Sequence, residues 1–110
     1  MSYKIHITKK AEADLESAAD YIEFTLINPD AAIKLLDDAN KAIQSLASAP
    51  KSRQLVDDPV LKAWGIRYVL VNNYMAFYII DEPMKTVHIV RFLYGKRNWI
   101  HILKSPSELF

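Results

Sequence analysis

The chain has no cysteine, only two glycines among its 110 residues, and no long hydrophobic run. The absence of cysteine excludes disulfides, thiolate zinc sites, thiol nucleophiles and iron–sulfur clusters, and it fits a reducing compartment. The two glycines lie thirty residues apart, so there is no glycine-rich phosphate loop and no Gly-x-Ser-x-Gly nucleophile motif. No stretch approaches the roughly 18 to 20 apolar residues of a membrane span, and segment 1–10 lacks the apolar region of an export signal. We therefore expect a cytoplasmic protein.

The net charge of +1 hides two halves of opposite sign. Residues 1–49 hold five basic and eight acidic side chains, whereas residues 50–110 hold nine basic and five acidic ones. A charge asymmetry of this kind indicates that the two halves meet different partners. At 12.6 kDa, about two thirds of the surface of the extended chain can be buried, so residues 1–110 are expected to form a single domain.

The first half predicts a strand followed by two helices. Residues 3–7 alternate apolar and polar side chains, and Thr8 is a suitable N-cap for a helix that continues toward Leu26 with an acidic outer face. The sequence Asn28-Pro29-Asp30 starts the second helix, and Pro50 ends it. Two helices of similar length joined by a short turn predict an antiparallel helical hairpin.

The second half predicts three strands after an ordered loop at 51–65, with a short turn near residues 60–64. The strands are rich in β-branched and aromatic residues, and turns separate them; they cover 66–71, 74–81 and 86–94. A short helix or tail is expected at 99–103. The order β-α-α-β-β-β predicts an α+β fold in which the helical hairpin covers one face of an antiparallel or mixed sheet.

Several kinds of site are not favoured by these residues. The three histidines, His6, His88 and His101, are far apart in the sequence and show no ligand spacing, so no metal is expected. The acidic side chains of the first helix, Asp37-Asp38 and Asp57-Asp58 are interpreted as solvated surface rather than as catalytic carboxylates. No cofactor is indicated.

Cations and aromatic residues gather in the last third of the chain. They are Arg67, Tyr74, Arg91, Tyr94, Lys96, Arg97, Trp99 and His101. Arginine and lysine can hold a phosphate while aromatic rings stack on unpaired bases, so the set suits single-stranded RNA. The alternative is structural: Arg91 pairs with an acidic residue inside the fold, and Tyr94 and Trp99 close the edge of the core. Neutral tyrosine is a poor base unless neighbouring cations lower its pKa.

The order and spacing of several motifs resemble the RelE/ParE superfamily of bacterial type II toxin–antitoxin toxins over nearly the whole chain. These motifs are Ala13-Asp14-Leu15 with Tyr21-Ile22, Asn28-Pro29-Asp30-Ala31-Ala32, Ala42-Ile43-x-x-Leu46, Gly65-Ile66-Arg67, Asn73-Tyr74 with Phe77-Tyr78, and the run from Val87 to Trp99. The resemblance implies a plasmid-stabilisation-like toxin that inhibits growth unless a cognate antitoxin neutralises it. RelE-like members cleave mRNA on the ribosome, whereas ParE-like members block DNA gyrase.

The central hairpin, residues 69–73, carries no charge, although RelE-like nucleases place basic side chains there. This departure and the Arg91-x-x-Tyr94-x-x-Arg97 tail favour the ParE-like, non-enzymatic alternative. A metal-independent mRNA endonuclease and an inactive antitoxin-binding module remain as alternatives. The residues assigned to phosphate or target binding are Arg67, Arg91, Lys96, Arg97 and Trp99. The catalytic candidates of the nuclease alternative are Arg67, Tyr94, Arg97 and His101.

The antitoxin is expected to lie in an apolar groove that the helical hairpin, the sheet edge and the basic tail form together. An acidic or amphipathic antitoxin segment would complement the positive second half of the chain.

Overall fold

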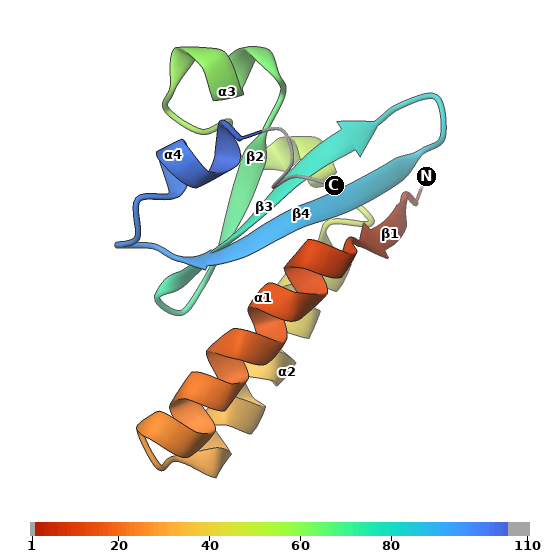
Figure 1. Cartoon of the computed structure of the whole chain (residues 1–110). Helices are drawn as coiled ribbons and strands as arrows, with labels where there is room; N and C mark the ends of the chain where they lie inside the picture. The colour runs from red at the N-terminus through yellow and green to blue at the C-terminus, as the bar shows by residue number, and fades with distance from the viewer. Residues whose placement is uncertain (1, 106–110) are drawn as a thin grey trace.

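A computed structural model describes residues 2–105 and shows the predicted α+β order (Figure 1). Strand β1 (Lys4–Ile7) leads into helix α1 (Lys9–Asp20), a π-helical turn (Tyr21–Thr25) and helix α2 (Pro29–Ser45). A 3₁₀ turn (Pro50–Ser52) and helix α3 (Pro59–Ala63) come before strands β2 (Arg67–Val71), β3 (Tyr74–Asp81) and β4 (Thr86–Tyr94), and helix α4 (Trp99–Leu103) follows them. Within residues 2–105, no helix combines the length and the apolar character needed to cross a membrane.

The four strands form a mixed sheet in the order β1-β4-β3-β2. Strand β1 runs parallel to β4, while β4 pairs with β3 and β3 with β2 in antiparallel fashion. Because β1 pairs only with residues 86–89 of β4, the edge of β4 beyond Ile89 receives its contacts from α1 instead. The register also shifts between Phe77 and Tyr78, which makes Val90 an extra residue in β4 and marks a β-bulge at this point.

The helices start where the sequence places their caps. Thr8 accepts a hydrogen bond from the Ala11 N–H at 3.2 Å, and Asn28 accepts one from the Ala31 N–H at 3.1 Å. Asp58 caps α3 by accepting from the Leu61 N–H, also at 3.1 Å. This backbone donor and the nearby Lys104 ammonium, 3.1 Å away, lower the pKa of the Asp58 carboxyl. Asp58 therefore has a structural role and is not part of the solvated surface that the sequence indicated.

Each face of the sheet carries its own hydrophobic core. On one face, the inner sides of α1 and α2 pack on Val69, Tyr78 and Ile89, with Leu35 and Ile43 of α2 buried in the contact. On the other face, side chains from the α3 and α4 segments pack on Phe77, Val90 and Leu93; the main contributors are Leu61, Ile66 and Leu103. The sheet is thus covered by helices of different lengths on its two sides.

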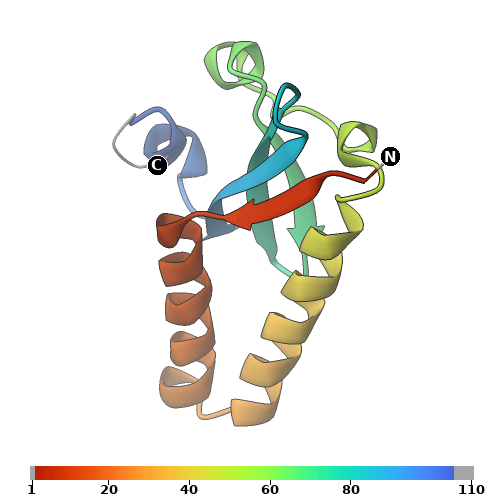
Figure 2. The same cartoon turned by 90° about the vertical axis from the view of Figure 1, so that its right-hand side faces the viewer.

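The helical hairpin extends well past the end of the sheet (Figures 1 and 2). As a result, its apolar side chains are buried near the sheet and exposed near the α1–α2 turn, where Leu26 is 56% and Ile27 82% exposed. Ile27 also has a φ of 52°, a left-handed conformation that strains a β-branched residue. The α2 helix ends at Ser45, earlier than Pro50 predicts, and the Ala47 carbonyl accepts a hydrogen bond from the Tyr3 N–H at 2.7 Å.

A surface network ties the β3–β4 turn to the start of the chain and to the 3₁₀ turn. Glu82 lies 2.8 Å from the ammonium groups of Lys51 and Lys85 and accepts a hydrogen bond from the Tyr3 hydroxyl at 3.0 Å. Hydrogen bonds from Lys51 first, then from Lys85 and Tyr3, lower the pKa of the Glu82 carboxyl to about 2.

We expect Glu82→Gln to lower the midpoint of thermal unfolding near neutral pH. A carboxyl whose pKa is lowered by folding stabilises the folded state above its ordinary pKa of about 4.3, and this contribution disappears as the pH falls toward about 2. The difference between wild type and variant should therefore close over that pH range in circular dichroism melts. A difference that stays constant with pH would contradict the assigned network.

Candidate functional site

The basic tail begins where β4 leaves the sheet. After Tyr94 the chain turns sharply, with the Gly95 N–H donating to the Asn73 carbonyl at 2.8 Å and the Arg97 N–H donating to the Tyr94 carbonyl at 3.0 Å. A Cβ at position 95 would lie only 3.2 Å from the Asn73 carbonyl oxygen, which explains glycine at this position. The turn places Lys96 and Arg97 on the surface beside the end of the β2–β3 hairpin.

Arg91 is part of a buried ion pair. Its Nε and Nη2 atoms donate to the two oxygens of Asp14 at 2.6 Å and 2.9 Å, and the two side chains are only 9% and 13% exposed. The same Asp14 carboxylate accepts the Phe92 N–H at 3.0 Å. Asp14 thus provides an acceptor at the edge of β4 just where β1 has ended.

The structural interpretation of Arg91 is confirmed by this pair. The interpretation of Asp14 as a solvated carboxylate of the outer helix face is wrong, because the edge of β4 packs against that part of α1. The sequence indicates that Arg91 needs an acidic partner but does not identify Asp14 as that partner, since the two residues are 77 positions apart.

Arg67 also forms hydrogen bonds within the protein, at the other edge of the sheet. Its Nη1 atom donates to the carbonyl oxygens of Arg53, at 2.5 Å, and Lys51, at 3.4 Å. Arg67 lies on β2, opposite Tyr78 of β3. Val71, four positions later, is at the end of β2 nearest the basic tail. At about 3.3 Å per residue, Arg67 is therefore roughly 13 Å along the strand from that end.

The remaining predicted residues divide into a core group and a surface group. Trp99 packs against Phe77 with ring centroids 5.3 Å apart and belongs to the second core. Arg97 and His101 are exposed and line a shallow pocket of about 320 Å³ with one side of Arg91. Tyr94 and Arg97 line a neighbouring pocket of about 390 Å³. The structure thus brings Arg91, Tyr94, Arg97 and His101 together and leaves Arg67 apart.

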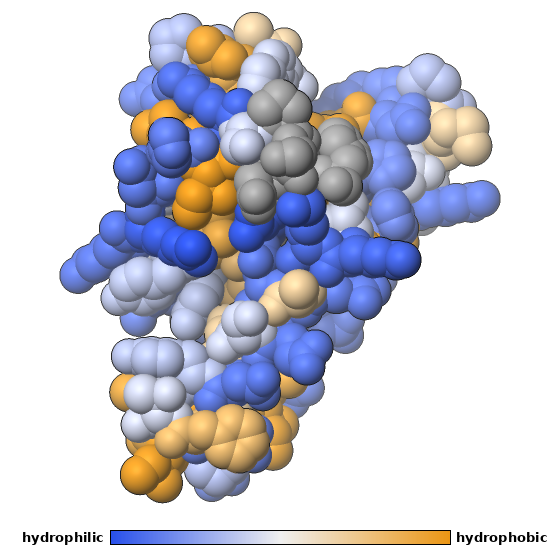
Figure 3. Space-filling model, viewed as in Figure 1, coloured by the Kyte–Doolittle hydropathy of each residue, from blue (hydrophilic) through white to orange (hydrophobic). Residues whose placement is uncertain are grey.

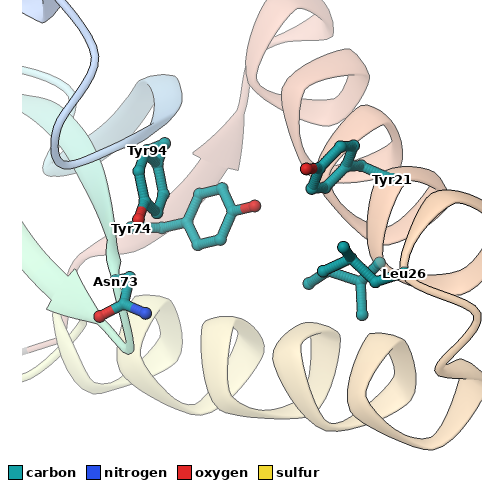
Figure 4. Close-up of a pocket in the computed structure, with 6 residues that line it drawn as sticks. Tyr21, Leu26, Asn73, Tyr74 and Tyr94 are labelled. Carbon is teal, nitrogen blue, oxygen red and sulfur yellow. The ribbon is translucent and has the colours of Figure 1, made fainter.

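A more apolar pocket lies beside the basic tail, between the helical hairpin and the end of the sheet (Figure 4). It measures about 550 Å³, and its lining residues are Tyr21, Ile22, Leu26, Asn73, Tyr74 and Tyr94. We call this pocket the hairpin groove. In Figure 4 the Tyr74 ring projects from the sheet toward the helices, and Tyr21 and Leu26 lie across the groove from it.

Tyrosine hydroxyl groups give this apolar groove a polar component. The Tyr74 ring stacks on Phe92 at 5.0 Å and meets the Tyr94 ring edge-on at 5.5 Å. Burial, assisted by the neighbouring Tyr94 and Tyr21 hydroxyls, raises the pKa of the Tyr74 phenol. Tyr74 consequently stays protonated and acts as a hydrogen-bond donor and apolar contact rather than as a base.

Exposed apolar side chains continue from the hairpin groove over the α1–α2 turn, and some of this apolar surface is visible at the lower end of Figure 3. We define the hairpin tip as the exposed residues Tyr21, Phe24, Leu26, Ile27, Ile33 and Leu36, which range from 41% to 82% exposed. Adjacent exposed apolar residues of this kind are typical of protein interaction sites. The sequence does not distinguish the tip, because its apolar residues have the same periodicity as those of the buried part of the hairpin.

Solved structures with a similar fold come from toxin–antitoxin systems. A chain described as the chromosomal ParDE TA system from P. aeruginosa superposes with a TM-score of 0.70 at 21% identity, covering 86% of this chain and 98% of that one. A chain from the RelBE2 toxin–antitoxin complex of Mycobacterium tuberculosis gives a TM-score of 0.58 at 19% identity, covering 86% and 99%. No curated protein matches this chain in sequence.

These similarities define the fold as one that occurs in toxin–antitoxin systems. The family model described as "ParE toxin of type II toxin-antitoxin system, parDE" matches residues 5–99. The chain belongs to this family and is therefore the toxin component of a type II toxin–antitoxin module, whose partner is a cognate antitoxin.

Proposed function

We propose that the free toxin acts by binding a protein target and that DNA gyrase is this target, as the ParE family implies. The observation that carries the proposal is that two of the candidate arginines are held in contacts within the protein. Arg91 is held by Asp14, and Arg67 holds the carbonyl groups of residues 51 and 53. Of the four cations assigned to phosphate binding, Lys96 and Arg97 are the two that are exposed.

A nuclease without a metal needs several positioned groups around the scissile phosphate, including a base and cations that stabilise the developing charge. Because Arg91 is held by Asp14 and Arg67 by the carbonyl groups of residues 51 and 53, Lys96 and Arg97 are the exposed cations left beside Tyr94 and His101. That is a small set for phosphate chemistry. The same residues suit a protein interface, where exposed arginine and tyrosine side chains are common anchors.

Antitoxin binding belongs in the hairpin groove. The groove and the hairpin tip offer apolar surface, and Arg97 lines the adjoining pocket that shares Tyr74 and Tyr94 with the groove. An amphipathic antitoxin segment fits this arrangement by placing apolar side chains against Leu26 and Tyr74 and acidic ones near Lys96 and Arg97.

The gyrase proposal is tested by adding the purified toxin to a DNA supercoiling assay. Inhibition that rises with toxin concentration and is reversed by the antitoxin is the expected result. The double substitution Lys96→Ala and Arg97→Ala should weaken inhibition at least about tenfold, since it removes both exposed cations of the tail. Full supercoiling activity in the presence of excess wild-type toxin would refute the proposal.

The nuclease alternative has one observation in its favour, namely the pocket that brings Arg91, Arg97 and His101 together. Primer extension on translated mRNA after toxin induction distinguishes the alternatives. New cleavage sites that disappear with Arg97→Ala would favour the nuclease. Neither cleavage nor supercoiling inhibition would favour an inactive antitoxin-binding module.

A further inference from the structure

Two histidines face each other on the parallel strands β1 and β4. His6 lies opposite His88 in the register, and their Nδ1 atoms are 2.8 Å apart. The ring planes are perpendicular, with centroids 5.0 Å apart. A contact this short between ring nitrogens requires one to donate and the other to accept, so one of the two nitrogens presents a lone pair.

We propose that these two nitrogens form a chelating site for a divalent transition-metal ion of the Zn²⁺ or Cu²⁺ type, with water completing the coordination shell. Imidazole nitrogen binds Zn²⁺ at about 2.0–2.1 Å, and imidazole suits Cu²⁺ as well. Two such ligands in neighbouring positions around one ion lie about 3 Å apart. Small rotations of the two side chains therefore convert the hydrogen bond into a chelate once the shared proton leaves.

Asp81 lies near the outer nitrogen of His88, where a small side-chain movement would bring it to hydrogen-bond distance. Its Oδ2 atom lies 3.6 Å from Nε2 of His88, the ring nitrogen that does not contact His6. A ligating histidine commonly donates its second N–H to a carboxylate, which fixes the tautomer and the ring orientation. The negative charge of Asp81 also favours a cation at this place, and the side chains of His88 and Asp81 are only 23% and 34% exposed.

Strand geometry explains why these groups share one face of the sheet. His88 lies opposite Ile79 of β3, and Asp81 follows two positions later, so its side chain projects to the same side. His6 is exposed, which allows an ion to enter with its water ligands. Lys4, two positions before His6, projects to the same face and opposes the ion, whereas Asp81 favours it.

Within the part of the chain that the structure describes, His6 and His88 are the two ligands of this site. Among residues 2–105, no group of three or more histidine, aspartate or glutamate side chains is arranged to hold an ion. A bound ion would nevertheless join β1 to β4, and it would stabilise the folded chain by mass action. The four-residue edge strand β1 would gain most from this link.

The test uses the full-length chain and the metal ions alone. Isothermal titration with Zn²⁺ should show one ion per chain, and His6→Asn or His88→Asn should each weaken binding at least about tenfold. Asp81→Asn should weaken it by about 10–100-fold, as is usual for the partner of a ligating histidine. His101→Asn removes the third histidine, outside the pair, and is the matched control with unchanged binding.

Electron paramagnetic resonance with Cu²⁺ gives a readout that does not depend on how well the variants fold. The wild-type spectrum should show coupling to two nitrogen nuclei, and lowering the pH should release the ion because protonated imidazole cannot ligate. Absence of two-nitrogen coupling in the wild type would overturn the proposal. So would unchanged Zn²⁺ binding in the folded His6→Asn variant, or loss of binding in His101→Asn.

Discussion

We expect Asp14→Ala to lower the free energy of unfolding, measured by urea denaturation, by about 3–5 kcal/mol. Removing one member of a buried ion pair leaves the other charge without its counterion in a poorly solvated place, and this usually costs several kcal/mol. Asp14 and Arg91 have side chains that are 13% and 9% exposed. The loss includes the hydrogen bond that Asp14 accepts from the Phe92 N–H at the edge of β4.

Asp20 is an exposed acidic residue of the same helix and provides the control. Asp20→Ala should change the unfolding free energy by no more than about 0.5 kcal/mol. Adding Arg91→Met to Asp14→Ala should recover part of the lost stability, since the double variant no longer buries a guanidinium. Equal stabilities of the Asp14→Ala and Asp20→Ala variants would show that the ion pair is not important for folding.

We also expect Leu26→Asp to weaken antitoxin binding by at least about 2 kcal/mol, which is about thirtyfold in Kd. The substitution places a carboxylate in the apolar hairpin groove, where it loses hydration without gaining a partner. Leu26 is 56% exposed, so the stability of the free toxin should change little. Isothermal titration of the purified toxin with its antitoxin measures the effect.

Leu70→Asp is the matched control. Leu70 is 65% exposed and lies on β2, outside the residues that line the hairpin groove. Its substitution introduces the same charge and should leave the antitoxin affinity within about twofold of wild type. A reversed result, with Leu70→Asp harmful and Leu26→Asp neutral, would move the antitoxin to the other face of the sheet.

The local elements of the fold are predictable from the sequence because local interactions determine them. Thr8 and Asn28 cap their helices as expected, and the strands 74–81 and 86–94 have the predicted bounds. The resemblance to the toxin superfamily is likewise confirmed by the family match over residues 5–99.

Contacts between distant segments are not predictable in the same way. The Asp14–Arg91 pair joins residues 77 apart, and the His6–His88 pair joins residues 82 apart. Both depend on the parallel pairing of β1 with β4, which composition and periodicity leave open. Spacing along the chain therefore predicts no ligand pair between His6 and His88, although the sheet places them side by side.

The helical hairpin projects beyond the sheet, so residues near the sheet and residues near the tip of the same two helices are under different selective constraints. Residues such as Leu35 and Ile43 are buried against the sheet, and their replacement reduces the stability of the whole domain. Leu26, Ile27 and Ile33 are exposed, so their replacement costs little folding stability and, in the proposed complex, changes the contact with the antitoxin. With the antitoxin bound as proposed, the overhang thus allows a toxin and its antitoxin to change together, one exposed residue at a time, while the fold stays the same.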